Sequence, residues 1–136
     1  MSGEAVNLET SPVEEHVLWP ENGICVHTNH YLKPGKNFRD LKPLRDPHPS
    51  TYLRCRRARK GLTELKRNID VQGIQNILKD HMDKPFSVCM HRNPEVEPMR
   101  QIVTCLSIVM NLSQRQIHYT LGNPCRGEAQ TIEVDW

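Results

Sequence analysis

The run His27-Thr28-Asn29-His30 is the local feature best suited to chemistry, and it follows a β-prone stretch. A strand that opens into a long loop is a common place for binding groups. A rigidly held Asn29 side-chain amide can donate to an oxyanion that develops on a substrate. Asparagine is also a frequent turn former, so a purely structural turn is the alternative.

The same segment contains residue types that bind metals. Cys25 and His27 would share one face of a strand, and His30 can curl back toward them. These three have no second Cys–His pair at a recognised zinc spacing. Cys89 and His91 could complete the set, but nothing in the sequence requires it. We therefore expect no metal site and no cofactor.

The cysteines leave a catalytic Cys–His pair open, which only geometry can decide. They are odd in number and scattered: Cys25, Cys55, Cys89, Cys105 and Cys125. Most lie among apolar neighbours, where cysteine behaves as a small hydrophobe, so we expect them to be reduced. Arg92 and Arg100 precede an apolar run, and either can reach a carboxylate or a cysteine.

Composition narrows the class of protein. The 136 residues fit one domain. A formal charge of +2 does not argue for a nucleic-acid partner. No apolar run approaches the roughly 20 residues that span a bilayer, and the first residues lack the pattern of a signal peptide. We expect a cytoplasmic protein without nucleic-acid or membrane partners.

The first third of the chain is predicted to be strands and loop. Ala5 to Thr10 alternates weakly between apolar and polar residues. Two β-prone runs, Glu15 to Trp19 and Ile24 to Thr28, flank a segment that ends in Asn-Gly, which predicts a hairpin between them. Four prolines within residues 33–49 predict a surface loop.

Two helices are expected next. Ser50 or Thr51 caps the first, whose apolar residues recur at steps of three and four. Its basic residues mostly fall away from that stripe, which favours a solvated face over a nucleic-acid interaction surface. Asp70 caps the second helix. The apolar stripe comprises Tyr52, Cys55, Ala58, Leu62, Leu65 and Ile69, and the inner face of the second helix comprises Val71, Ile74, Ile77, Leu78 and His81.

The last part is strand-like. We expect strands at Phe86 to Met90, at Ile102 to Met110, at Gln116 to Leu121 and near Gln130 to Val134. The second of these is apolar on both faces, as a strand covered on both sides should be. Strands, two helices and strands again predict an α+β layered fold.

Several segments resemble motifs of the peptidase C45 family, which are amide hydrolases and acyltransferases similar to isopenicillin N acyltransferase. Residues 23–32 resemble its G-x-x-x-H-T-N-H-F/Y segment, and residues 4–12 resemble the preceding strand. Residues 52–57 resemble an S-x-x-R-x-x-R helix, Asp80-His81 and Ser87-Val88-Cys89 resemble its D-H and S-I/V-C marks, and residues 104–110 with 121–125 resemble its closing strands and G-x-P-C turn. The resemblance covers nearly the whole chain.

This resemblance implies an αββα sandwich of the N-terminal-nucleophile hydrolase type. In that family an exposed N-terminal cysteine attacks an amide carbonyl, and here the resemblance begins downstream of that cysteine. It implies an oxyanion-hole role for Asn29, a catalytic role for Arg100, and a substrate pocket beside His30 and Tyr31. The ligand would be a small-molecule amide or acyl donor.

The position of the nucleophile leaves three interpretations. The chain is a fragment, a subunit whose partner chain brings the missing N-terminal half, or a relative that does not catalyse. We expect the C-terminal half of an amide hydrolase or acyltransferase. A non-catalytic binding module that retains the fold is the alternative.

Overall fold

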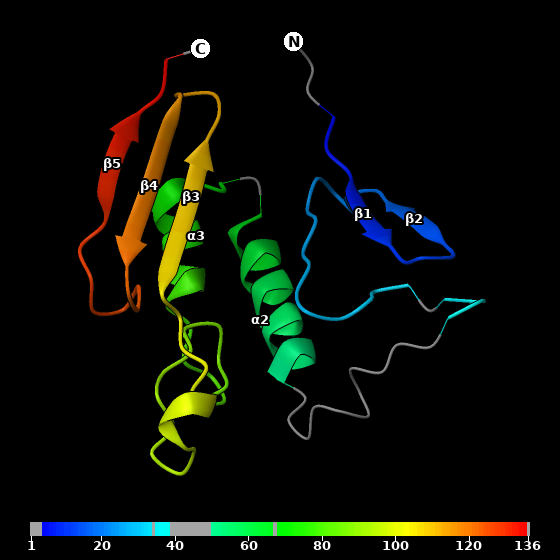
Figure 1. Ribbon diagram of the computed structural model, residues 1–136. Helices are drawn as coiled ribbons and strands as arrows, with labels where there is room; N and C mark the ends of the chain where they lie inside the picture. The colour runs from blue at the N-terminus through cyan, green and yellow to red at the C-terminus, as the bar shows by residue number, and fades with distance from the viewer. Residues whose placement is uncertain (1–3, 34, 39–49, 67, 136) are drawn as a thin grey trace.

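Two helices lie side by side between a three-stranded sheet and a two-stranded hairpin in the computed structural model of the chain (Figure 1). The structure describes residues 4–33, 35–38, 50–66 and 68–135. All strand pairs within this part of the chain are antiparallel. The predicted α+β class is therefore confirmed. The proline-rich loop predicted over residues 33–49 lies mostly outside the described residues.

The N-terminal hairpin pairs β1 (Asn7–Thr10) with β2 (Glu15–Leu18). Its turn is held by Ser11, whose hydroxyl oxygen accepts the Glu14 N–H at 2.9 Å and whose own N–H donates to the Glu14 carbonyl at 2.8 Å. The predicted hairpin between the Glu15 to Trp19 run and the Ile24 to Thr28 run is wrong, because Glu15–Leu18 pairs with β1 instead.

The predicted Asn-Gly turn does form. Glu21 and Ile24 exchange two backbone hydrogen bonds of 3.0 Å. Asn22 and Gly23 between them have φ angles of 53° and 76°, which is the backbone that a type I′ turn requires. Residues 25–28 then run on without a strand partner among the residues that the structure describes.

Helix α2 (Ser50–Leu65) and helix α3 (Val71–Leu78) match the predicted pair. Asp70 caps α3, because its carboxylate accepts the Gly73 N–H at 2.7 Å. The predicted apolar stripe of α2 is only partly buried, since Cys55 is enclosed whereas Tyr52 is 38% exposed. Ile69 lies beyond the end of α2 and is also exposed.

The second sheet has the order β3 (Leu106–Asn111), β4 (Gln116–Leu121) and β5 (Gln130–Glu133). The two C-terminal strand predictions are confirmed, but the strand expected from Ile102 begins only at Leu106. Phe86 to Met90 is not a strand. Its backbone makes separate hydrogen bonds instead of a ladder. The Cys89 N–H donates to the Asp80 carbonyl, and the Met90 N–H donates to the Thr104 hydroxyl oxygen.

The two faces of this sheet differ in polarity. Helix α3 contacts β3 from one side, where Val109 is 6% exposed. The opposite face is apolar and largely uncovered, and five of its apolar side chains are 44–68% exposed. The register places these residues together on that face: Leu106, Ile108, Met110, Leu121 and Ile132. The expected cover on both faces of β3 is therefore present on one face only.

The buried core is small. Among the described residues, five apolar side chains are buried: Val26, Cys55, Cys89, Met90 and Val109. A chain of this length ordinarily encloses a larger core. Within the described part of the chain, no helix has the length and apolar character needed to cross a membrane.

Candidate functional site

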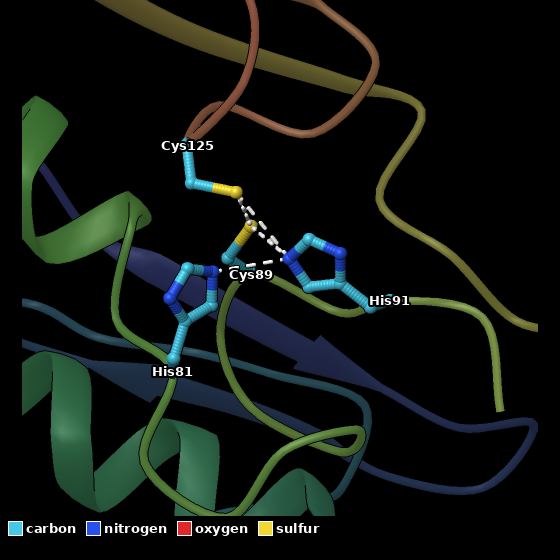
Figure 2. Close-up of side chains that lie close together, drawn as sticks. All are labelled: His81, Cys89, His91 and Cys125. Carbon is cyan, nitrogen blue, oxygen red and sulfur yellow. Dashed lines mark hydrogen bonds between the residues drawn. The ribbon is translucent and has the colours of Figure 1, made fainter.

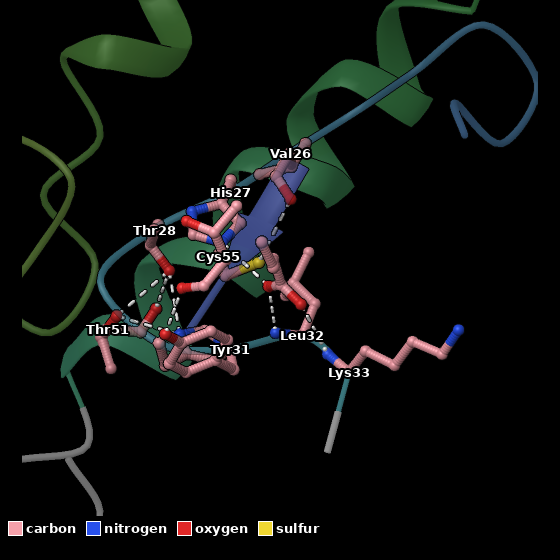
Figure 3. A network of polar contacts seen from close by, with 11 residues as sticks. Val26, His27, Thr28, Tyr31, Leu32, Lys33, Thr51 and Cys55 are labelled. Atoms are coloured by element: carbon pink, nitrogen blue, oxygen red, sulfur yellow. Dashed lines mark hydrogen bonds and ion pairs between the residues drawn. The ribbon is translucent and has the colours of Figure 1, made fainter. Parts of the chain in front are cut away.

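The buried carboxylate of Glu9, on β1, holds both ends of the segment that contains Asn29. The Glu9 side chain is 1% exposed. Its Oε1 lies 3.0 Å from His27 Nε2 and accepts the backbone N–H of Leu32, and its Oε2 accepts the backbone N–H of Lys33 (Figure 3). Charge-assisted hydrogen bonds of this kind are strong. Residues 27–33 are therefore bent around one acidic group.

These contacts also set the ionisation of Glu9. Burial alone acts to raise the pKa of the carboxyl, because it penalises the charged form. The N–H groups of Leu32 and Lys33, together with His27, favour the charged form and outweigh burial. The net result is a pKa of Glu9 below its ordinary value.

The middle of the segment is tied to the start of α2. The Thr28 hydroxyl donates to the Thr51 carbonyl at 2.9 Å, and the Thr51 hydroxyl lies 3.0 Å from His30 Nδ1. Thr51 is 1% exposed. The His30 ring also stacks against Tyr52, with centroids 4.1 Å apart. His30 therefore holds residues 27–33 against α2.

Asn29 lies between these anchors and is exposed. Its Oδ1 accepts a hydrogen bond of 2.9 Å from Arg54 Nη2, on α2. A guanidinium only donates, so this contact fixes which end of the Asn29 amide faces the helix. The NH2 group of Asn29 therefore points away from Arg54. A donor fixed in this way can bind a carbonyl oxygen or an oxyanion.

The other predicted site residues contact other parts of the chain. The Tyr31 hydroxyl donates to the Thr10 carbonyl at 2.7 Å, which fastens the segment to β1. The Arg100 side chain is 81% exposed and lies 3.8 Å from Glu97. Arg100 also lines a cavity of about 370 Å³ with Ser50 and His91. Its assignment as a catalytic arginine stays a prediction.

Cys25, His27 and His30 do not converge as a metal site would require. His27 faces Glu9, His30 faces Thr51, and Cys25 is exposed. In the part of the chain that the structure describes, the group of side chains that could hold a metal is a different one. It comprises His81, Cys89, His91 and Cys125, whose ligand atoms all lie within 4.8 Å of one another.

This second group comes from three segments. His81 follows α3, Cys89 and His91 lie on the extended stretch before η1 (Pro98–Arg100), and Cys125 lies in the loop after β4 (Figure 2). Cys89 is fully buried and His91 is 7% exposed. Cys89 Sγ and His91 Nε2 lie 3.4 Å apart, so the two side chains are directed to the same place.

Burial and charge argue against a catalytic pair of Cys89 and His91. Burial raises the pKa of the Cys89 thiol. Burial also lowers the pKa of His91, and the neighbouring Lys84, His81 and Arg126 side chains lower it further. Both shifts favour the neutral thiol and neutral imidazole over the reactive ion pair. A fully buried sulfur is also out of reach of a substrate.

Sequence reasoning missed Glu9, Thr51 and Arg54 as supports of the candidate site. Glu9 lies within the N-terminal segment that carries the family resemblance, which is the one signal that could have singled it out. The Cys–His group was missed as a set because its spacing matches no recognised zinc pattern.

No protein-family model matches the chain, and no curated protein matches it at a significant level. The resemblance to amide hydrolases and acyltransferases therefore stays a prediction based on its motifs.

Proposed function

We propose that this chain carries the oxyanion-binding half of a cysteine-type amide hydrolase or acyltransferase, built on one half of an αββα sandwich. The nucleophilic cysteine belongs to a partner segment. The observation that carries the proposal is the hydrogen bond from Arg54 to Asn29 Oδ1, because it leaves the Asn29 NH2 group oriented as an exposed donor.

The uncovered sheet face supports the same proposal. A sheet that stands alone buries its apolar face under its own helices and turns its polar face to water. Here Ser107 and Thr120 share the covered side, whereas Ile108, Met110 and Leu121 are exposed on the other. In a sandwich of two sheets that apolar face packs against a second sheet. The partner segment would supply it.

The chemistry then divides between the two halves. The partner thiol forms a sulfur–carbon bond with the amide carbonyl, and the carbonyl oxygen becomes an oxyanion that accepts from Asn29. Collapse expels the amine, which leaves with the thiol proton. Water or a second amine then takes the acyl group from sulfur. Splitting one difficult transfer into two easier ones is the benefit of covalent catalysis.

The test is complementation. The chain alone should hydrolyse neither amides nor thioesters above background. Co-expression with an upstream coding segment that exposes an N-terminal cysteine should restore turnover. In that assembly Asn29→Ala should lower kcat by about 10²- to 10³-fold, the usual effect of losing one oxyanion donor, with little change in the melting temperature.

Asn76→Ala is the matched control, because Asn76 is an exposed asparagine on α3. It should leave kcat unchanged. Turnover by the isolated chain that depends on an internal cysteine would contradict the proposal. An assembly that binds amides but never turns them over would support the non-catalytic binding module instead.

A further inference from the structure

The side chains of Cys89, His91, Cys125 and His81 converge on one point. His91 Nε2 lies 3.4 Å from Cys89 Sγ, 3.3 Å from Cys125 Sγ and 3.0 Å from His81 Nε2. The two sulfurs lie 3.6 Å apart. Figure 2 shows all four side chains directed at the same small space.

Hydrogen bonding does not account for this convergence. An imidazole nitrogen has one bonding direction, with either one lone pair or one hydrogen. His91 Nε2 has three polar neighbours at contact distance, so at most one of them is satisfied by it. A cation at the centre would bind all four atoms at once.

We propose that His81, Cys89, His91 and Cys125 bind one Zn²⁺ ion tetrahedrally. Zinc binds thiolate sulfur at about 2.3 Å and imidazole nitrogen at about 2.0–2.1 Å, so the edges of its tetrahedron measure about 3.3 to 3.8 Å. The four contacts above, at 3.0 to 3.6 Å, lie close to that range. The two remaining distances, from His81 to the sulfurs, are within 4.8 Å. A shift of about 1 Å in the exposed His81 would bring them to the length of a tetrahedral edge.

The ligand types select the metal. Two sulfurs and two imidazoles in a tetrahedron are typical of zinc, whereas magnesium and calcium require oxygen ligands. On binding, the Cys89 and Cys125 thiols each lose a proton to solvent, so the two thiolates neutralise the charge of the ion. All four positions belong to the protein, which makes the site structural and leaves no open position for a substrate.

The surroundings support the ligands. The Asn123 side chain donates to Cys89 Sγ at 3.7 Å and to the Met90 carbonyl at 2.7 Å. The Cys89 N–H donates to the Asp80 carbonyl at 3.0 Å, and the Asp80 carboxylate pairs with Arg57 on α2. Partners of this kind orient metal ligands and tune their affinity.

The ion would join three separate segments of the fold. The ligands come from the end of α3, the extended stretch before η1 and the loop between β4 and β5. These are the points where the helical layer meets the sheet. The zinc would therefore add to the stability that the small apolar core provides, and this role is independent of the proposed catalytic role.

The test uses the full chain, purified with a reductant and freed of metal. We expect one zinc per chain and a rise in melting temperature when zinc is added. Cobalt(II) in its place should give the strong visible bands of a tetrahedral ion and a thiolate-to-cobalt charge-transfer band. Cys89→Ser and Cys125→Ser should each abolish the charge-transfer contribution of one sulfur and weaken zinc binding more than 100-fold.

Two further variants keep the test decisive if the cysteine variants fold poorly. His81→Ala removes an exposed ligand and should alter the cobalt spectrum in a chain that still folds by circular dichroism. Asn123→Ala should weaken zinc binding about 10- to 100-fold, as loss of an outer partner does. Cys105→Ser, which replaces an exposed cysteine outside the group, is the matched control and should bind zinc normally.

Three results would overturn the proposal. The first is substoichiometric zinc binding or an octahedral cobalt spectrum without a thiolate band. The second is an equal loss of binding in Cys105→Ser. The third is a Cys89–Cys125 disulfide in protein purified with a reductant, because it would mean that the close sulfurs serve as a covalent link.

Discussion

At the scale of single residues, Glu9 determines where Asn29 lies. One buried carboxylate accepts from Leu32 and Lys33 and contacts His27, so both sides of the Asn29 turn are fastened to β1. Arg54 then orients the amide itself. The candidate oxyanion donor therefore depends on a carboxylate that would never touch the substrate.

The lowered pKa of Glu9 predicts how stability responds to acid. The folded state favours the ionised carboxyl, so its contribution is complete above the ordinary glutamate pKa of about 4.3 and is lost as the pH falls through the lower folded value. Glu9→Gln should cost about 1–3 kcal/mol at pH 7, since glutamine keeps one oxygen and leaves one of the two backbone N–H groups without its acceptor. Its stability should then fall less steeply below pH 4.3.

Urea unfolding at a series of pH values measures both effects. Glu15→Gln is the control, because Glu15 is an exposed carboxylate on β2, and it should keep the wild-type profile. Parallel acid profiles for Glu9→Gln and the wild type would show that Glu9 does not hold the segment as a carboxylate.

At the scale of elements, two glycines set the approach of α2 to α3. A Cβ added to Gly61 would lie 2.7 Å from an Ile77 side-chain carbon, and one added to Gly73 would lie 2.8 Å from Leu65. A methyl group at either position would therefore require a neighbouring side chain to shift. This close packing explains why a glycine, which is unfavourable inside a helix, occupies position 61 of α2.

Gly73→Ala should destabilise the protein in spite of the higher helix propensity of alanine, which is worth about 1 kcal/mol. The new methyl group would lie 2.9 Å from Asp70 Oδ1 as well as against Leu65, so it disturbs the helix cap and the packing together. Overpacking costs about 1–3 kcal/mol, and we expect a net loss of about 1 kcal/mol.

Thermal unfolding measures this change. Combining Gly73→Ala with Leu65→Val should recover part of the loss, because the smaller side chain makes room for the methyl group. A single variant that is more stable than the wild type would show that the helices can separate without cost.

At the scale of the whole molecule, the uncovered face of β3 to β5 is the main feature. Apolar side chains lie next to one another on this face and are exposed, whereas few apolar side chains are buried in the core. Contiguous apolar surface of this kind mediates association. The basic residues of α2 are, by contrast, largely engaged, since Arg57 pairs with Asp80, Arg59 with Glu21 and Lys60 with Glu64.

The chain alone should therefore self-associate through this sheet face. Ile108→Lys places a charge at its centre and should weaken association by tenfold or more, because burial of one such side chain contributes about 1.5–3 kcal/mol. Sedimentation velocity over a range of concentrations measures the shift. Met99→Lys is the control, since Met99 is 96% exposed and lies on η1. A wild-type monomer at every concentration, with a cooperative melt, would contradict this prediction.

The sequence by itself determined the elements whose signals are local. The helix cap at Asp70, the Asn-Gly turn and the end of β4 at Leu121 each depend on residues close together in the sequence. They could therefore be predicted from the sequence alone. Strand pairing was predicted less well, because the Glu15 run can pair with either neighbour and only packing chooses between them.

Only the tertiary structure decided which side chains meet. Glu9 and His27 are 18 residues apart, and Cys89 and Cys125 are 36 residues apart. No periodicity connects positions so distant. Glu9 meets His27 because residues 25–33 lie against β1, and Cys89 meets Cys125 because the stretch before η1 lies against the loop after β4. The candidate oxyanion donor could be found from its motif, whereas the carboxylate that holds it and the proposed zinc site could be found only in three dimensions.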